Sequence, residues 1–124
     1  MDQGFNDVKA ALSDYFDGIY DGSGDKLRSA FHPSAHIYAA TDGALIDYPL
    51  DAFVDRVTSR DRSGAENPPR TDKIVSVDFA GATSALAKVE LSIPGIDFVD
   101  FLSLIKIDGR WRIIAKTYHA DAQK

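Results

Sequence analysis

Two side chains in the last third of the sequence have the types and spacing needed for acid–base chemistry. Asp100 lies inside the apolar run "FVDFL" at 98–102, and His119 ends the run "RWRIIAKTYH" at 110–119. Runs of this composition are expected to be buried, and a buried carboxylate needs a partner. A carboxylate beside a histidine favours the imidazolium, whereas burial raises the pKa of a carboxyl group. The pair therefore predicts a proton-transfer site, provided that both side chains reach one cavity.

The turn between the two runs decides whether these side chains meet. Asp-Gly at 108–109 is a strong hairpin signal and predicts a two-residue turn. In that register Asp100 faces Thr117 and Phe98 faces His119, so Asp100 and His119 lie diagonally on one face. Their backbones would be roughly 7 to 8 Å apart, a distance that side chains can close. A different turn length would shift the register by a residue and change this face.

Both faces of the predicted hairpin are apolar, whereas a sheet with one face in water alternates cleanly. The face of Asp100 also carries Leu102, Leu104 and Ile113, which favours packing against helices. The other face, around Phe101, has charges at its rim and is typical of a homodimer surface. The two faces can also be assigned the other way round.

Helical periodicity dominates the first half of the chain. Apolar residues recur at spacings of three and four over 5–20, which predicts an amphipathic helix with Asn6 as a possible cap. A short helix is expected from about Asp25, which can cap it, until Pro33 prevents continuation. A third helix is expected over 49–60.

Strands are expected where the apolar period becomes two. Residues 35–40 and 44–48 predict a small hairpin, and 61–72 is a polar loop that could be a lid or a slack connection. Four longer strands follow as an antiparallel meander, at 73–80, 84–93, 96–107 and 110–119. Helices followed by such a sheet make an α+β fold.

Composition limits the classes of function. The chain has 124 residues, which fits a single domain over 1–124. A formal net charge of -5 disfavours a nucleic-acid partner, and no apolar run is long enough for a membrane span. The absence of cysteine excludes disulfides and thiolate chemistry. We expect a cytoplasmic protein that starts at its natural end, without nucleic-acid or membrane partners.

No motif predicts a metal or a cofactor. His32 and His36 have the spacing of a helical metal pair, but Pro33 breaks the helix between them. The segment from Asp21 begins like a calcium loop, yet its sixth position is Lys26 instead of glycine. No nucleophile motif of the form G-x-S-x-G occurs.

Aromatic side chains could line a pocket for a flat apolar ligand, although aromatic residues at helical or strand spacing are more often core. Tyrosine and tryptophan are favoured because their buried polar atoms need a partner that a ligand could supply. The candidate ligand-binding residues are Tyr15, Tyr38, Tyr48, Phe53, Phe98, Leu102 and Trp111.

The sequence resembles the nuclear transport factor 2-like superfamily, and within it the small bacterial proteins called lumazine-binding-like or SnoaL-like. The similarity covers nearly the whole chain, and its most specific pieces are residues 11–39 and 100–119. The resemblance implies a cystatin-like cone in which a curved antiparallel sheet wraps around N-terminal helices and opens to a pocket. It also implies a homodimer through the outer sheet face. The fold hosts isomerases, dehydratases, cyclases and pure binders, so it does not by itself select a reaction.

Within that superfamily, the ketosteroid isomerase branch uses a tyrosine and a protonated aspartic acid as oxyanion donors and a second aspartate as base. Asp100 is on a late strand and Tyr15 on the first helix, where that branch has two of these groups. No motif identifies the base, for which Asp42 and Asp47 are the nearest candidates.

Three functions remain open from the sequence. The first is a protein that binds a small hydrophobic or aromatic molecule. The second is a cofactor-independent isomerase or lyase in which Asp100 and His119 act as acid and base. The third is a protein-interaction module with a filled cavity. Asp100 can also be structural, by accepting backbone hydrogen bonds or pairing with a cationic side chain inside the cone, and His119 can simply be exposed near the chain end.

Overall fold

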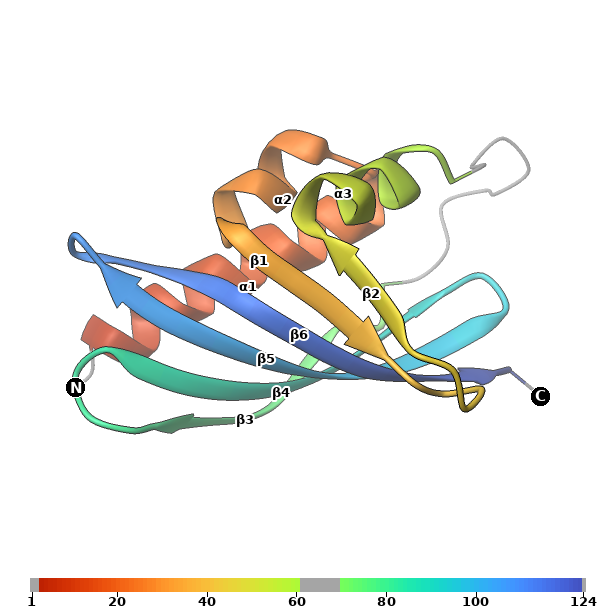
Figure 1. The fold of residues 1–124 in the computed structure, drawn as a ribbon. Helices are drawn as coiled ribbons and strands as arrows, with labels where there is room; N and C mark the ends of the chain where they lie inside the picture. Colours follow the sequence, from red (N-terminus) through yellow and green to blue (C-terminus); the bar gives the residue numbers. More distant parts are fainter. Residues whose placement is uncertain (1–2, 61–69, 124) are drawn as a thin grey trace.

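The structure is a computed structural model and describes residues 3–60 and 70–123. Three helices lie on one side of a curved six-stranded sheet (Figure 1), which confirms the predicted α+β cone. The helices are α1 (Gln3–Asp21), α2 (Gly24–Ala30) and α3 (Leu50–Thr58). The strands are β1 (Phe31–Ala39), β2 (Ile46–Pro49), β3 (Lys73–Phe79), β4 (Ser84–Ile93), β5 (Ile96–Ile107) and β6 (Arg110–Ala122). None of the helices in these ranges is long and apolar enough to span a membrane.

The predicted helices are present, but their first residues differ from the expected ones. α1 begins at Gln3, so Asn6 lies within the helix and does not cap it. α2 is capped by Ser23, whose hydroxyl accepts a hydrogen bond from the backbone N–H of Lys26 at 3.2 Å. Asp25 therefore lies in the first turn of α2, where its charge suits the positive end of the helix dipole.

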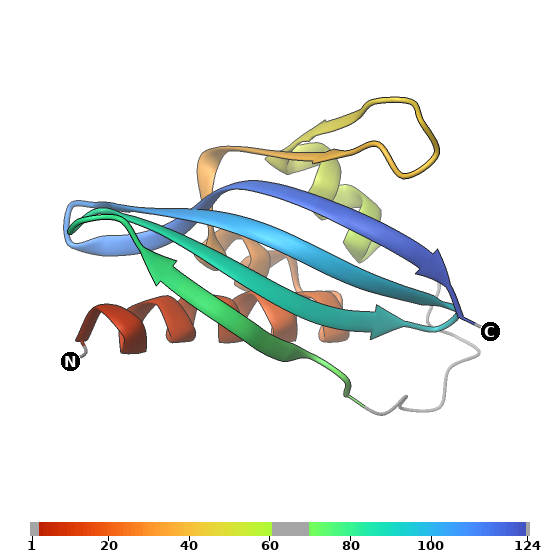
Figure 2. The same cartoon turned by 90° about the horizontal axis from the view of Figure 1, so that it is seen from below.

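The strand order is β2-β1-β6-β5-β4-β3. The small hairpin β1–β2 and the meander β3 to β6 are both antiparallel, as the sequence predicts, and β1 pairs with β6 in parallel. The first strand thus lies beside the last, which brings the helical half of the chain against the C-terminal hairpin. Seen from below (Figure 2), β3 to β6 lie in front of the helices.

The Asp-Gly turn forms as predicted, with positive φ at both Asp108 (53°) and Gly109 (76°), as a two-residue hairpin turn requires. The predicted register then fails further along the hairpin. Leu104 faces Ile113, but the next partner of Ser103 is Ala115, so one additional residue, Ile114, is accommodated in β6. This irregularity is a β-bulge.

The bulge changes the face of every residue after it in β6, because side chains alternate along a strand. Asp100 faces Tyr118, and the prediction that it faces Thr117 is wrong. Lys116 and Tyr118 consequently point to the helix-covered side, whereas His119 lies on the opposite side and is exposed. Without the bulge these directions would be reversed.

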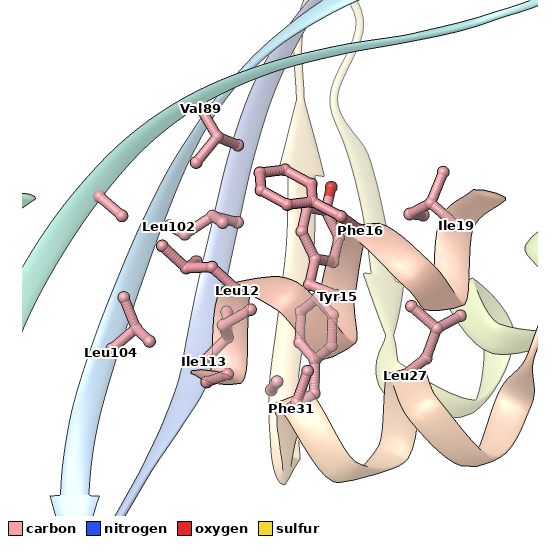
Figure 3. Close-up of a cluster of buried hydrophobic side chains, with 14 of the residues drawn as sticks. Leu12, Tyr15, Phe16, Ile19, Leu27, Phe31, Val89, Leu102, Leu104 and Ile113 are labelled. Carbon is pink, nitrogen blue, oxygen red and sulfur yellow. The ribbon is translucent and has the colours of Figure 1, made fainter. Parts of the chain in front are cut away.

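The core lies between α1 and the inner face of the sheet. Figure 3 shows α1 side chains, among them Leu12 and Tyr15, facing Leu102 and Leu104 of β5. α1 and α2 approach closely at Gly18, where an added Cβ would lie 2.7 Å from side-chain atoms of Leu27. This contact requires glycine and fixes the helices against each other.

Candidate active site

A cavity of about 580 Å³ lies between the helices and the inner sheet face. Its volume is within the range of small-molecule sites. Side chains from α1, α3 and four strands form the wall. The lining residues are Tyr15, Ile19, Tyr48, Phe53, Asp55, Arg56, Val57, Ser59, Arg60, Leu91, Ile93, Phe98, Lys116 and Tyr118.

A chain of three polar side chains lies in and behind the wall of this cavity. Nζ of Lys116 donates a hydrogen bond to the hydroxyl of Tyr15 at 2.7 Å. The Tyr15 hydroxyl in turn donates to Oδ2 of Asp100, and Nζ of Lys116 lies 3.6 Å from the same oxygen. The three elements α1, β5 and β6, which are far apart in the sequence, each contribute one member.

The helix and the two strands fix these side chains by packing. Tyr15 lies on the apolar face of α1 and is fully buried. Its ring packs edge-on against Phe31 at 5.7 Å between centroids, and Figure 3 shows its hydroxyl at the end of the ring away from Phe31. Asp100 is placed inward by strand alternation, and Lys116 is placed inward by the bulge.

Burial perturbs the acid–base behaviour of this group. Burial raises the pKa of the Tyr15 hydroxyl well above its usual value, and the Asp100 charge raises it further. Tyr15 therefore stays protonated and acts as a hydrogen-bond donor. Burial also lowers the pKa of the Lys116 amine, although Asp100 opposes this shift. Desolvation is the larger effect on Lys116, so the neutral amine is easier to reach than in an exposed lysine.

Aromatic rings surround the nitrogen of Lys116. Nζ lies 4.7 Å from the centroid of Phe53, 5.0 Å from that of Tyr118 and 5.1 Å from that of Tyr15. Ring faces attract cations, and the attraction is greater where water is excluded. A positive charge on this nitrogen is thus stabilised by three rings and one carboxylate.

The polar rim of the cavity comes from α3 and β2. The guanidinium of Arg56 lies over the ring of Tyr48 at 5.1 Å. Burial raises the pKa of the Tyr118 hydroxyl, with Tyr48 adding to the shift and Arg56 opposing it. Arg60 donates to the backbone carbonyl of Ile19 at 2.9 Å, which connects the end of α3 to α1.

Some of the residues predicted for ligand binding lie in the cavity wall and others do not. Tyr15, Tyr48, Phe53 and Phe98 line it. The other three are placed elsewhere: Leu102 is in the core, Trp111 packs edge-on against Phe79 at 5.6 Å, and Tyr38 stacks on His36 at 5.9 Å.

The predicted acid–base pair is not brought together. His119 is on the outer side of β6, with its side chain 58% exposed and Nε2 3.0 Å from Oδ1 of Asp121. The prediction of one cavity shared by Asp100 and His119 is therefore wrong, and the cause is the bulge at Ile114. Asp100 does point inward, but it is not among the lining residues and lies behind Tyr15 and Lys116.

Lys116 is the candidate site residue that the sequence did not single out. The alternative in which Asp100 pairs with a cationic side chain inside the cone describes what the structure shows. A predicted register that included the bulge would have placed residue 116 on the inner face. Residue 116 is the only lysine between Arg110 and His119, so Lys116 would have been identified as the cationic partner. An isolated sequence contains no clear signal for such a bulge.

Other candidates do not form a site. Asp47 is exposed and lies 2.8 Å from Nδ1 of His36, and Asp42 is exposed in the β1–β2 turn. Over residues 3–60 and 70–123, no group of three histidine, cysteine or acidic side chains could hold a metal ion. Most of the loop predicted at 61–72 lies outside the described residues.

The curved sheet and the helices on one side of it define a nuclear transport factor 2-like protein. A nuclear transport factor 2-like protein of unknown function from Shewanella baltica matches with a TM-score of 0.85 and 27% identity, covering 98% of this chain and 96% of that one. A second, from Silicibacter pomeroyi, matches with a TM-score of 0.81 and 25% identity, covering 94% and 95%. The family described as putative lumazine-binding matches residues 3–119, and the chain belongs to that family. Aldolase FrzH from Cladobotryum sp. is 29% identical over 121 residues, which are 94% of this chain and 90% of the relative.

Proposed function

We propose that the protein binds a small, largely apolar molecule with a carbonyl group in the cavity, and that Lys116 holds the carbonyl oxygen. The observation that carries this proposal is the presence of a buried amine in the wall of a mainly aromatic cavity. An ammonium has three donors, and Lys116 gives one to Tyr15. A carbonyl oxygen is the neutral acceptor that suits a remaining donor in an apolar site.

The remaining cavity wall supports a flat ligand. Phe53, Phe98 and Tyr118 contribute ring surface, and Leu91 and Ile93 contribute aliphatic surface. Aromatic rings stack on or pack edge-on against a flat ligand. The polar rim formed by Arg56 and Tyr48 would leave the outer end of the ligand near polar groups.

Binding of two matched probes tests the proposal. Methyl benzoate has a carbonyl oxygen that accepts a hydrogen bond, and propylbenzene has a similar size without that oxygen. We expect methyl benzoate to bind about tenfold more tightly, as one good hydrogen bond to a charged group allows. Ligand-detected NMR titration measures both affinities.

A matched pair of variants assigns the effect. Lys116→Met keeps much of the side-chain volume and removes the donor, so the preference for methyl benzoate should disappear. Lys106→Met removes an exposed lysine and should leave the preference unchanged. Equal affinity of the wild-type protein for the two probes, or no binding of either, contradicts the proposal.

Catalysis is the second candidate function, and the coupled Lys116–Tyr15–Asp100 chain favours it. Proton transfer beside a carbonyl needs a group that stabilises the enolate oxygen and a group that moves a proton. Lys116 can take the first role, and Tyr15 can relay a proton to Asp100. A relative named as an aldolase agrees with chemistry at a carbonyl. Exchange of the α-hydrogens of a bound ketone with deuterated water, followed by NMR, would detect this activity directly.

We also propose that two copies of this chain associate through the outer sheet face. Phe101 is 48% exposed and Leu86 41% exposed on neighbouring strands of that face. Lys88, whose Nζ lies 5.9 Å from the Phe101 ring centroid, and Glu90 share this side of β4. Across a two-fold axis the lysine of one copy can face the glutamate of the other.

A further inference from the structure

We propose that Lys116 is a covalent catalytic residue, whose amine condenses with an aldehyde or ketone in the cavity to form an iminium. This inference rests on the proposed function, because it needs a carbonyl compound to enter the cavity. It names what the buried amine does beyond holding an oxygen atom. Lysines that react in this way lie in hydrophobic pockets, where the neutral amine is accessible.

The position of the amine supports the proposal. Lys116 is 5% exposed and is still one of the residues that line the cavity, so its side chain is largely shielded from bulk water and lies beside the space for a ligand. Burial of the side chain favours the neutral amine. The rings of Phe53 and Tyr118 flank the nitrogen and would hold a flat carbonyl compound beside it.

The hydrogen-bonded chain gives the proton of the ammonium a route out. Lys116 donates to the Tyr15 oxygen, and the Tyr15 hydrogen points to Asp100. Transfer of one proton along each bond converts the ammonium and the carboxylate into a neutral amine and a neutral carboxyl group. Tyr15 ends the transfer as it began, protonated, which agrees with its raised pKa. No charge has to leave the buried site.

The condensation is balanced with these groups alone. The amine nitrogen attacks the carbonyl carbon, and the proton that the nitrogen then loses passes to the carbonyl oxygen to give a carbinolamine. The carbinolamine hydroxyl takes the proton that was relayed to Asp100, returned through Tyr15, and leaves as water, with the nitrogen electron pair forming the carbon–nitrogen double bond. Asp100 is a carboxylate again at the end of the sequence. The sum is one ammonium and one carbonyl compound giving one iminium and one water. Tyr15 is the proton donor nearest to the nitrogen in this sequence.

The site is suited to the product as well as to the reactant. The iminium keeps a positive charge on the same nitrogen, and the rings of Phe53, Tyr118 and Tyr15 together with Asp100 stabilise that charge. The relayed proton arrives at Oδ2 of Asp100, which accepts the Tyr15 hydrogen bond, and Oδ1 has no hydrogen-bond partner among the described residues.

Reductive trapping tests this inference on the intact protein. The protein is incubated with benzaldehyde and sodium cyanoborohydride at about pH 7, and the modified lysines are located by peptide mass spectrometry. Because burial lowers the pKa of the Lys116 amine and Lys116 borders the cavity in which benzaldehyde would bind, we expect Lys116 to be labelled faster than exposed Lys9 or Lys106. The comparison is made within one wild-type molecule and therefore does not depend on whether a variant folds.

Two further measurements assign the label to the cavity. Methyl benzoate forms no imine, so as a competitor it should slow labelling of Lys116 and leave Lys9 unaffected. Lys116→Met should remove the fast-labelled peptide, whereas Lys106→Met should retain it. Labelling confined to exposed lysines overturns the inference. If methyl benzoate binds in that case, the proposed function stands and only the covalent step is wrong; if it does not bind, both fail.

Discussion

Replacement of Asp100 by asparagine should destabilise the fold strongly, because it leaves the Lys116 charge without a counter-charge. Asp100 is fully buried and the Lys116 side chain is 6% exposed, with 3.6 Å between the charged groups. Removal of one member of a buried pair costs about 3 to 5 kcal/mol. Asparagine has nearly the same shape and keeps an oxygen that can accept the hydrogen bond from Tyr15. The decrease in the free energy of unfolding therefore reports the removal of the negative charge.

The double variant Asp100→Asn/Lys116→Met separates charge pairing from packing. Replacement of both members leaves no unpaired charge, and such replacements are often close to neutral. We therefore expect the double variant to recover most of the loss, with a coupling free energy of at least about 2 kcal/mol. Asp78→Asn, at an exposed carboxylate on β3, serves as the control and should change stability little.

Urea unfolding followed by tryptophan fluorescence measures these free energies. The chain has one tryptophan, Trp111, which is buried and reports on the core. A loss below about 1 kcal/mol for Asp100→Asn, together with additive effects in the double variant, would refute the buried pair.

Three other predictions follow from the same structure. In Asp100→Asn the pKa of Lys116 should fall further, because the attraction that opposes desolvation is gone. The unfolded chain then binds more protons than the folded chain between the lowered folded-state pKa and the ordinary lysine pKa. The free energy of unfolding of the variant should therefore rise relative to wild type as the pH is raised toward the ordinary lysine pKa, in urea titrations at a series of pH values. A difference in the free energy of unfolding between the two proteins that does not change with pH would contradict this assignment. His119→Ala should leave probe affinity and deuterium exchange unchanged, because His119 lies on the outer side of β6; a loss of about tenfold in NMR titration would restore the histidine to the site. Phe101→Glu should convert the proposed dimer to a monomer in analytical ultracentrifugation, whereas Phe5→Glu on α1, where the phenylalanine is 40% exposed against 48% for Phe101, should not. A monomeric wild-type protein would contradict the outer face as an interface.

Most of the fold could be predicted from the sequence because it depends on local signals. Apolar spacing over 5–20 predicts α1, and the Asp-Gly pair at 108–109 predicts the last hairpin. The four-strand meander follows from alternation between Lys73 and His119. Each of these features is determined by neighbouring residues or by one short turn.

The site depends on one residue that local signals do not identify. The inward direction of Asp100 follows from its place among alternating apolar residues, and it is buried as expected. The prediction that His119 is the partner of Asp100 is wrong, because the bulge at Ile114 turns the side chain of Lys116 inward and that of His119 outward. The additional residue, Ile114, is apolar like its neighbours, and no glycine marks its position. The order of apolar and polar residues therefore does not locate this bulge. The meeting of Tyr15 with Asp100 is likewise a long-range contact, which only the resemblance had suggested.

The most direct test of the account is a crystal structure of the protein soaked with methyl benzoate. We expect the ring of the probe to lie between Phe53 and Tyr118, with its carbonyl oxygen about 3 Å from Nζ of Lys116. A probe bound with its carbonyl directed to the rim, or bound outside the cavity, would contradict the assignment of Lys116 as the group that holds the carbonyl.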